Sequence, residues 1–258
     1  MIFYQAITML DKKVLFGGAK MPLYDQILDA IMKDIKTGRL KEGDKLPTEM
    51  ELSKAFGVSR PTVRNALLRL ANQGYLVRVR GNGTFVTKPK LEQESVQFIE
   101  SYNQEMKAKG LVPKTQVLEF RVIPCDDRIA SKLDIRPDDK VIKLTRLRYA
   151  TPYYEEQPVL LTTVYLPCNE ASAILSCDLE DASLYETLES QGITICRAER
   201  ELEIKLVYGK AAKLLEVPKG SPAHFISSVG YDQNDKPVEY SESFYPAGRN
   251  KFIIRINR

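Results

Sequence analysis

Three short blocks decide the fold of the front third of this 258-residue chain: Leu46-Pro47-Thr48-Glu49, then Val58-Ser59-Arg60-Pro61-Thr62-Val63-Arg64-Asn65-Ala66-Leu67, and then Gly81-Asn82-Gly83-Thr84-Phe85-Val86. Thr48 can cap a helix, because Glu51 three residues later completes a capping box. Gly57 can end that helix in the left-handed conformation, and Ser59 can cap the next one. Two helices joined this tightly must cross steeply, which is the geometry of a helix-turn-helix.

Segments on both sides of these blocks extend the unit. An earlier helix is predicted between Pro22 and Gly38, because apolar residues recur at helical spacing there. After Gly74, apolar and polar residues alternate up to Arg80, and a Gly-Asn-Gly tip leads into a second strand. The alternation places Arg78 and Arg80 on one face of this hairpin. The chain from residue 21 to residue 88 is therefore predicted to be a winged helix-turn-helix.

Basic and hydroxyl side chains gather where such a unit would meet DNA. Arg60 and Arg64 lie one turn apart near the start of the second helix of the pair, the part that enters the major groove. Arginine can bond two acceptors of guanine, and Thr62 suits a phosphate or a thymine methyl group. Ser59 and the helix start suit a backbone phosphate, and the hairpin arginines can lie along the minor groove. Two exposed arginines alone would favour a solvated helix face, but the surrounding motif favours DNA.

Charge and length indicate how the chain is divided. Residues 21–90 carry a net charge of +6 and residues 91–258 a net charge of −4. A basic front and an acidic back are typical of a DNA-binding module joined to a domain that does not bind DNA, although a chance fluctuation of a few charges gives the same pattern. The length suits two domains. We expect an N-terminal extension over residues 1–20, a linker over 89–96 and a second domain over 97–258.

Several classes of protein are disfavoured by what the sequence lacks. No stretch approaches the ~20 apolar residues that cross a bilayer, and the opening residues do not form a secretory signal. We therefore expect a cytoplasmic protein without a membrane partner. The four cysteines form no C-x-x-C pair, and with the single histidine, His224, they offer no zinc-ligand spacing. Free thiols, no metal site and no cofactor are the expectations.

The rear domain alternates strand-like runs with short helices, which predicts an α+β fold with a mainly antiparallel sheet. A hairpin is predicted around Asn234-Asp235-Lys236. The expected elements are 117–123, 128–133, 141–149, 159–166, 183–191, 199–207, 210–215, 225–231, 238–245 and 252–256.

Two of these strands carry charged side chains beside apolar ones. The two-residue period of a strand puts Arg146 and Arg148 on the same face as Ile142 and Leu144. On the strand 238–245, one face carries Glu239, Ser241, Ser243 and Tyr245. A buried arginine pair needs an anion, and phosphate matches its donor fork well. From the strand pattern alone, two arginines paired with Glu239 or another carboxylate, or a solvated edge strand, are the more common explanation.

The front unit resembles the winged-helix domain of the GntR family. Members of that family carry L-P-[ST]-E, then G-V-S-R-x-T-V-R-x-A-L, then G-x-G-T-F-V, and this chain has all three blocks in order. An arginine that helps to grip DNA usually follows the first block, whereas this chain has Met50 there, which leaves that contact without its usual side chain. The resemblance implies that the DNA-facing set includes Thr48, Arg60, Thr62, Arg64, Arg80 and Gly81.

The rear domain resembles the effector-binding UTRA domain of the HutC branch of that family, which has a chorismate-lyase-like fold. The matching blocks are Ser101–Lys107 with Gly110, Lys143–Arg148, Ser183–Tyr185, and Val238–Ser241 with Tyr245. In members that bind amino-sugar phosphates these blocks supply the pocket. The resemblance therefore implies that the phosphate end is held by Ser101, Arg146, Arg148, Ser183 and Tyr185, and the sugar hydroxyls by Glu239 and Tyr245.

These observations favour a ligand-controlled transcription regulator, most often a repressor in this family, that acts as a homodimer on double-stranded DNA with an inverted repeat. A phosphorylated sugar or amino sugar is the expected effector, and a non-phosphorylated carboxylate or amino-acid derivative is the alternative. An enzyme is the rival class, because the rear fold resembles a lyase. The sequence argues against it, since no nucleophile–base–acid set or phosphate-cradling glycine loop appears. A constitutive architectural DNA-binding protein would leave the arginine and serine pocket unexplained.

Overall fold

The computed structural model describes residues 22–93, 101–152, 154 and 156–256, so the expected N-terminal extension, residues 1–20, lies outside the described residues. The chain divides into two compact units, Met1–Pro89 and Lys90–Arg258. Within the described residues, no helix has the length and apolar character needed to span a membrane. All four cysteines are free. The described part of the chain contains no group of three or more His, Cys, Asp or Glu side chains that could hold a metal ion.

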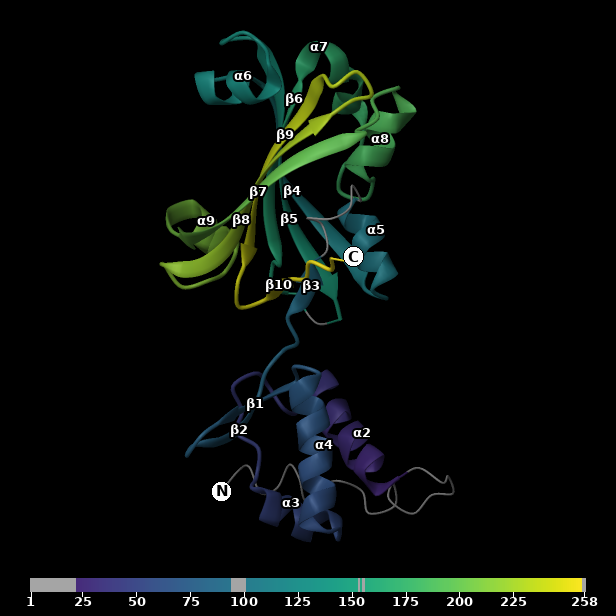
Figure 1. Ribbon diagram of the computed structural model, residues 1–258, viewed down its shortest axis with the longest axis vertical. Coiled ribbons are helices and arrows are strands. Elements are labelled where there is room, and N and C mark those ends of the chain that lie inside the picture. The colour runs from purple at the N-terminus through teal and green to yellow at the C-terminus, as the bar shows by residue number, and fades with distance from the viewer. Residues whose placement is uncertain (1–21, 94–100, 153, 155, 257–258) are drawn as a thin grey trace. The chain divides into compact units, whose positions relative to one another are not determined.

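The front unit contains the helices α2 (Leu23–Lys36), α3 (Glu49–Phe56) and α4 (Arg60–Asn72), followed by the antiparallel strands β1 (Leu76–Val79) and β2 (Gly83–Val86) (Figure 1). Each helix buries its apolar stripe, as the helical spacing predicts. The resulting core is formed by Ile27, Ile31, Leu52, Phe56, Val63, Ala66, Leu67 and Leu70.

Local side-chain hydrogen bonds fix where these helices begin and end. The Thr48 backbone N–H donates to the Glu51 carboxylate over 2.8 Å, and the Glu51 N–H donates to the Thr48 hydroxyl over 3.3 Å, so the predicted capping box is present. Gly57 follows α3 with φ 65° and ψ 30°. Ser59 accepts from the Thr62 N–H over 3.3 Å at the start of α4. The predicted helix-turn-helix is therefore confirmed at its three boundary residues.

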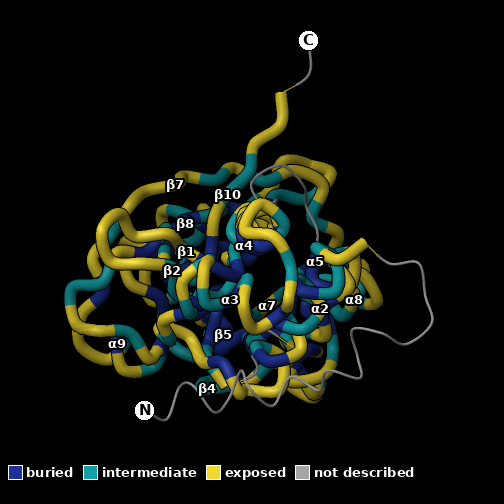
Figure 2. Tube along the Cα trace, turned by 90° about the horizontal axis from the view of Figure 1, so that it is seen from below, coloured by how far each residue is buried: buried dark blue, intermediate teal, exposed yellow. Residues whose placement is uncertain are grey.

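The rear unit is built on a six-stranded sheet in which every neighbouring pair is antiparallel, in the order β4-β5-β6-β9-β8-β7. This confirms the predicted mainly antiparallel sheet. Figure 2 shows that most residues of the outer strand β7 are exposed, whereas most residues of β5 are buried. The strands are β4 (Val112–Pro124), β5 (Lys140–Thr151), β6 (Leu160–Pro167), β7 (Arg197–Val207), β8 (Ser221–Tyr231) and β9 (Pro237–Pro246).

Short helices cover both faces of this sheet (Figure 1). On one face lie α5 (Tyr102–Ala108), α7 (Cys168–Ala171), the 3-10 helix η2 (Ser172–Ser176) and α8 (Leu184–Ser190). On the other face lie α6 (Asp127–Leu133) and α9 (Gly209–Leu214). Leu144 and Val164 of the sheet pack against Leu184 and Leu188 of α8, whereas Val141 packs with α6 on the opposite side.

At both ends of the rear domain the strands lie at other residues than the sequence pattern indicated. The expected linker, residues 89–96, contains the strand β3 (Leu91–Gln93), which pairs in parallel with β10 (Asn250–Phe252). The Gln93 side-chain amide donates to the Asn250 side-chain oxygen over 2.8 Å, and both residues are buried. The expected element 252–256 shares only Phe252 with the observed strand β10, because the pairing ends at Phe252 and Ile256 is 89% exposed. The remaining linker residues, 94–96, lie outside the described part of the chain.

Candidate functional site

The exposed start of α4 carries the side chains predicted to face DNA. Arg60 and Arg64 are both exposed, one turn apart. The Ser59 and Thr62 hydroxyls lie 2.7 Å apart and share a hydrogen bond, so the two side chains are fixed beside Arg60. Thr48 is exposed at the start of α3. This arrangement presents two guanidinium groups and a helix N-terminus on one surface, the combination that reads base edges and holds a phosphate.

The hairpin adds a second basic element. Arg78 lies on β1, but Arg80 and Gly81 lie in the turn between β1 and β2, with Gly81 at φ 77°. The predicted alternation therefore ends one residue before Arg80, because β1 stops at Val79. The loop before α3 supports the hairpin, since Leu46 N–H donates to the Thr84 carbonyl over 2.8 Å.

Glu49 is a residue of this surface that the sequence did not single out. The Arg64 Nε atom lies 3.3 and 3.2 Å from the two carboxylate oxygens of Glu49. The Arg78 Nη2 atom lies 3.2 Å from the same carboxylate. Glu49 therefore holds an arginine of the recognition helix and an arginine of the hairpin in one network. Its place in the Leu-Pro-Thr-Glu block, directly before Met50, was the available signal. Met50 itself is half exposed at the start of α3.

The rear unit contains a cavity of about 110 Å³ on the sheet face that α5 and α8 cover. All seven side chains expected from the family resemblance to hold an effector line this cavity, although they come from four elements far apart in the chain. They are Ser101, Arg146, Arg148, Ser183, Tyr185, Glu239 and Tyr245. The two-residue period correctly placed Arg146 and Arg148 of β5, and Glu239 and Tyr245 of β9, on one face.

The two arginines are almost fully buried, at 3% and 5% exposure. The Nε and Nη1 atoms of Arg146 and the Nε atom of Arg148 have no hydrogen-bond partner. Burial, together with the charge of Arg148, lowers the pKa of Arg146 well below its usual value. Burial also lowers the pKa of Arg148 to about 10. Arg148 Nη1 donates to the Thr115 hydroxyl, and its guanidinium carbon lies 5.1 Å from the Tyr102 ring centroid.

A carboxylate, Glu239, lines the same cavity as the arginines. Burial raises the pKa of Glu239, while hydrogen bonds from Tyr185 and Ser241 act in the opposite direction. The charges of Arg200 and Arg146 also lower the Glu239 pKa. Burial raises the pKa of Tyr185, so its hydroxyl remains a hydrogen-bond donor. The sequence pattern also allowed Glu239 to pair with the arginines. The charge of Glu239 does act on Arg146, but two nitrogens of that arginine remain without hydrogen bonds.

Two helix starts complete the cavity wall. Ser101 caps α5 by accepting from the Gln104 N–H over 3.2 Å, and Ser183 caps α8 by accepting from the Glu186 N–H over 3.4 Å. The Gln104 side chain donates to the Glu186 carboxylate over 3.4 Å, which links the two helices. Both cap hydroxyls therefore have fixed positions on the cavity wall.

Several lining residues were not expected to bind a ligand. Ser241 and Ser243 alternate with Glu239 on β9, a pattern visible in the sequence, whereas Arg200 on β7 had no local signal. The others include Tyr102, Asn103, Glu105, Thr162 and Ser228. His224 lies outside this cavity lining, and its ring contacts Phe252 edge-on with 5.0 Å between centroids.

Residues 23–86 match the family described as bacterial regulatory proteins, gntR family, and residues 108–251 match the UTRA domain. The repressor NagR of Bacillus subtilis is 33% identical over 239 residues, which span 92% of this chain and 96% of that protein. The chain belongs to the GntR family. The predicted family and both predicted domain types are confirmed.

Other members of the GntR family resemble the chain over the same length. The mannosyl-D-glycerate transport/metabolism system repressor MngR of Escherichia coli K12 is 31% identical over 92% of this chain and 97% of its own length. The crystal structure of PhnF from Mycobacterium smegmatis superposes with a TM-score of 0.72 at 28% identity, covering 89% of this chain and 99% of PhnF. This GntR-family chain is therefore a ligand-responsive DNA-binding transcription regulator, as expected from its two domains.

Proposed function

We propose that the protein is a homodimeric repressor that binds an inverted-repeat operator and that a phosphorylated sugar or amino sugar in the rear cavity controls this binding. The observation that carries the proposal is the pair of buried arginines in the cavity lining, since two nitrogens of Arg146 and one of Arg148 lack hydrogen-bond partners. A buried guanidinium is costly without an acceptor, and a phosphate dianion supplies several acceptors at once.

The rest of the cavity suits a small polar molecule. Its volume of about 110 Å³ is below the ~300–1,000 Å³ of pockets for drug-sized ligands. Glu239, Ser243 and Tyr245 offer acceptors and donors for hydroxyl groups on the sheet face beside the arginines. Ser101, Ser183 and Tyr185 add hydroxyl donors for phosphate oxygens. MngR represses a mannosyl-D-glycerate transport and metabolism system, which supports a sugar-derived effector for this protein as well.

Two copies of the front unit would bind the two halves of the operator. Thr48, Ser59, Thr62 and Gly81 would hold the backbone through hydroxyl and N–H groups. Arg60 and Arg64 would contact base edges in the major groove, and Arg78 and Arg80 would lie along the minor groove. The effector would act through its different affinities for the DNA-binding and the non-binding arrangements of the dimer.

A paired thermal-shift and operator-binding experiment tests this proposal. Purified protein is heated with hexose 6-phosphates, amino-sugar 6-phosphates, the same sugars without phosphate, and small carboxylates. We expect stabilisation by one of the phosphorylated sugars alone, and the same compound should change the affinity for an inverted-repeat operator measured by fluorescence anisotropy. Stabilisation only by unphosphorylated sugars or carboxylates would contradict the phosphate assignment. An operator complex with one chain per site would contradict the dimer.

A further inference from the structure

The outer strand β7 has an edge that pairs with no other strand among the described residues. Its eleven residues, Arg197–Val207, pair with β8 in one continuous register on the inner side. The opposite edge leaves a row of backbone N–H and C=O groups free to bind another strand. Such an edge is a template for adding a strand from a second chain.

The other outer strand, β4, carries the features by which proteins normally protect an edge. Pro113 and Pro124 lie within β4, and its register shifts between Val117 and Glu119. Prolines and bulges discourage pairing with another strand. The register of β7 is uninterrupted, and its sequence contains no proline. The two edges of the sheet therefore differ, and only the β7 edge is suited to pairing.

Alternate residues of β7 form an exposed apolar stripe. Leu202, Ile204 and Leu206 are 42%, 63% and 55% exposed and share one face of the strand. Adjacent apolar side chains at a sheet edge are costly to leave in water, so their exposure indicates a partner surface. On the other face, the Lys205 Nζ atom lies 2.9 Å from the Glu203 carboxylate.

From this edge we infer that a second copy of the chain docks in antiparallel orientation on β7, with Ile204 on the two-fold axis. In a symmetric antiparallel pair, the residue on the two-fold axis lies opposite the same residue of the second chain. A residue that precedes the axis by a given number of positions lies opposite the residue that follows the axis by the same number. An axis at Ile204 pairs Leu202 with Leu206 and Glu203 with Lys205, and each pair occurs twice.

Neighbouring registers are less favourable. An axis at Leu202 would place Glu201 opposite Glu203, and an axis at Glu203 or at Lys205 would place two like charges on the axis itself. Like charges directly opposite each other destabilise a strand pair, whereas apolar and opposite-charge pairs stabilise it. Of these four registers, the one centred on Ile204 alone places apolar residues opposite apolar residues without opposing like charges. This inference rests on the homodimer of the proposed function and identifies its interface.

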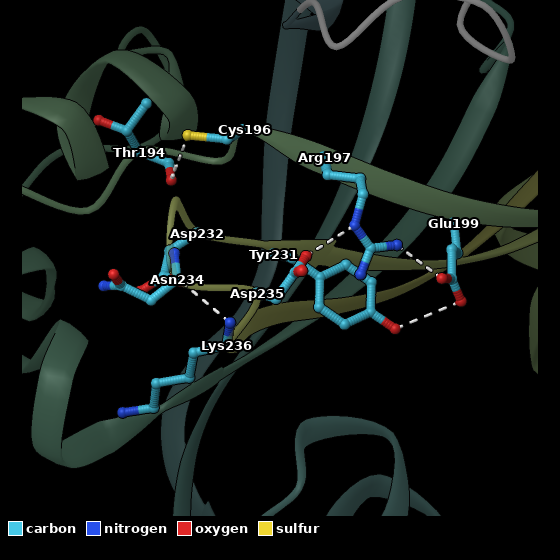
Figure 3. Close-up of polar contacts among 9 residues, drawn as sticks. All are labelled: Thr194, Cys196, Arg197, Glu199, Tyr231, Asp232, Asn234, Asp235 and Lys236. Atoms are coloured by element: carbon cyan, nitrogen blue, oxygen red, sulfur yellow. Dashed lines mark hydrogen bonds and ion pairs between the residues drawn. The ribbon is translucent and has the colours of Figure 1, made fainter.

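The beginning of β7 is already held in place (Figure 3). The Arg197 Nε atom donates to Asp235 over 2.9 Å, and its Nη1 atom donates to Glu199 over 2.6 Å. The Tyr231 hydroxyl donates to the second oxygen of Glu199 over 3.3 Å. These contacts tie the strand to the β8–β9 hairpin. Because the edge is ordered before association, a partner strand binds with a smaller loss of conformational entropy.

Cysteine cross-linking tests the register directly. In a background with Cys168, Cys177 and Cys196 replaced by serine, we expect Ile204→Cys to form a disulfide-linked dimer under mild oxidation. The Cα atoms of directly opposed residues lie ~4.5–5.5 Å apart, within the range that a disulfide bridges. Leu202→Cys is the matched control, because its two copies would be displaced by four residues, or about 14 Å. Cross-linking of Leu202→Cys in preference to Ile204→Cys would overturn the register.

Charge exchange tests the same interface without a covalent bond. Glu203→Lys and Lys205→Glu should each raise the Kd of the dimer by about 2- to 30-fold, since either change creates two like-charge pairs. The double variant Glu203→Lys/Lys205→Glu should restore the dimer. Glu201→Lys, which faces Val207 in this register, should change the Kd little. The measurement is sedimentation velocity over a concentration series.

The outcomes separate this inference from the proposed function. A protein that is dimeric and binds its operator, but shows no Ile204→Cys cross-link and no effect of Glu203→Lys, would overturn the β7 interface and leave the repressor proposal intact. A protein that remains monomeric at all concentrations, while a sugar phosphate still stabilises it, would overturn both the interface and the dimeric operator complex.

Discussion

Replacing Arg146 by methionine should make the ligand-free protein more stable and remove its response to a sugar phosphate. Arg146 is 3% exposed, and two of its three nitrogens have no hydrogen-bond partner. Methionine has a similar length and carries no charge, so it can fill the space of the arginine without leaving a buried cation. The wild-type side chain therefore costs stability until an anion binds.

The expected magnitude follows from buried charges in other proteins. Apolar replacement of a whole buried ion pair stabilises proteins by about 1–4 kcal/mol, and we take the same scale for Arg146 because two of its nitrogens have no partner. In a domain of this size each kcal/mol shifts the Tm by about 2–4 °C. Saturating ligand at about 100 times its Kd adds about 2.7 kcal/mol to the wild type. The ligand-free variant should therefore melt a few degrees above the ligand-free wild type, and ligand should raise only the wild-type Tm.

Differential scanning calorimetry with and without the sugar phosphate measures both effects. Arg121→Met is the control, because Arg121 is exposed and pairs with Glu119 outside the cavity; it should leave the ligand response unchanged. A clear fall in the Tm of ligand-free Arg146→Met would refute the reasoning, since it would show that the guanidinium stabilises the empty cavity. A full ligand response in that variant would refute the role of Arg146 in binding the anion.

Three further predictions concern the front unit and the cavity. Arg60→Ala should weaken operator binding by about 1–3 kcal/mol and relax the preference at one base of each half-site; Arg69→Ala, whose side chain pairs with Asp25, is the control, and equal losses on operator and random DNA would contradict base reading. Met50→Arg should add a phosphate contact and steepen the dependence of log K on log salt by about 1 per front unit, so an unchanged slope in anisotropy titrations would argue against Met50 lying near DNA. Because the pKa of Glu239 is raised by burial, the folded state binds its proton more tightly than the unfolded state, and this residue's contribution to stability falls as pH rises above 4.5. The stability of wild type relative to Glu239→Gln, measured by urea unfolding, should therefore decrease from pH 5 to pH 8, and a pH-independent difference would contradict the raised pKa.

The front unit could be predicted almost residue by residue because its signals are local. The capping box of Thr48, the left-handed Gly57 and the cap Ser59 each act within a few residues, and all three have the expected geometry. Glu49 was missed because its role depends on contacts across the fold. Arg64 and Arg78, its partners, are 15 and 29 residues away in the chain.

In the rear unit, the faces of the strands could be predicted, but their order in the sheet could not. The two-residue period placed Arg146 and Glu239 on cavity-facing sides of their strands. Nothing in either strand shows that β6 lies between them, because strand order depends on long-range pairing. The position of Arg200 beside the cavity depends on the registers of two strand pairs. Arg200 lies opposite Ser228 of β8, and Ser228 lies opposite Ser241 of β9. A strand of three residues such as β3 has no period to detect.

The pairing of β3 with β10 determines the order in which the two units can finish folding during synthesis. The first strand of the rear unit is completed by the last one, and the bonded pair Gln93 and Asn250 is separated by 157 residues. A ribosome adds about 5–20 residues per second, so this separation corresponds to roughly 8–30 s of translation. The front unit, complete by Pro89, can fold throughout that interval. A nascent chain therefore has its helix-turn-helix before it has a closed effector cavity.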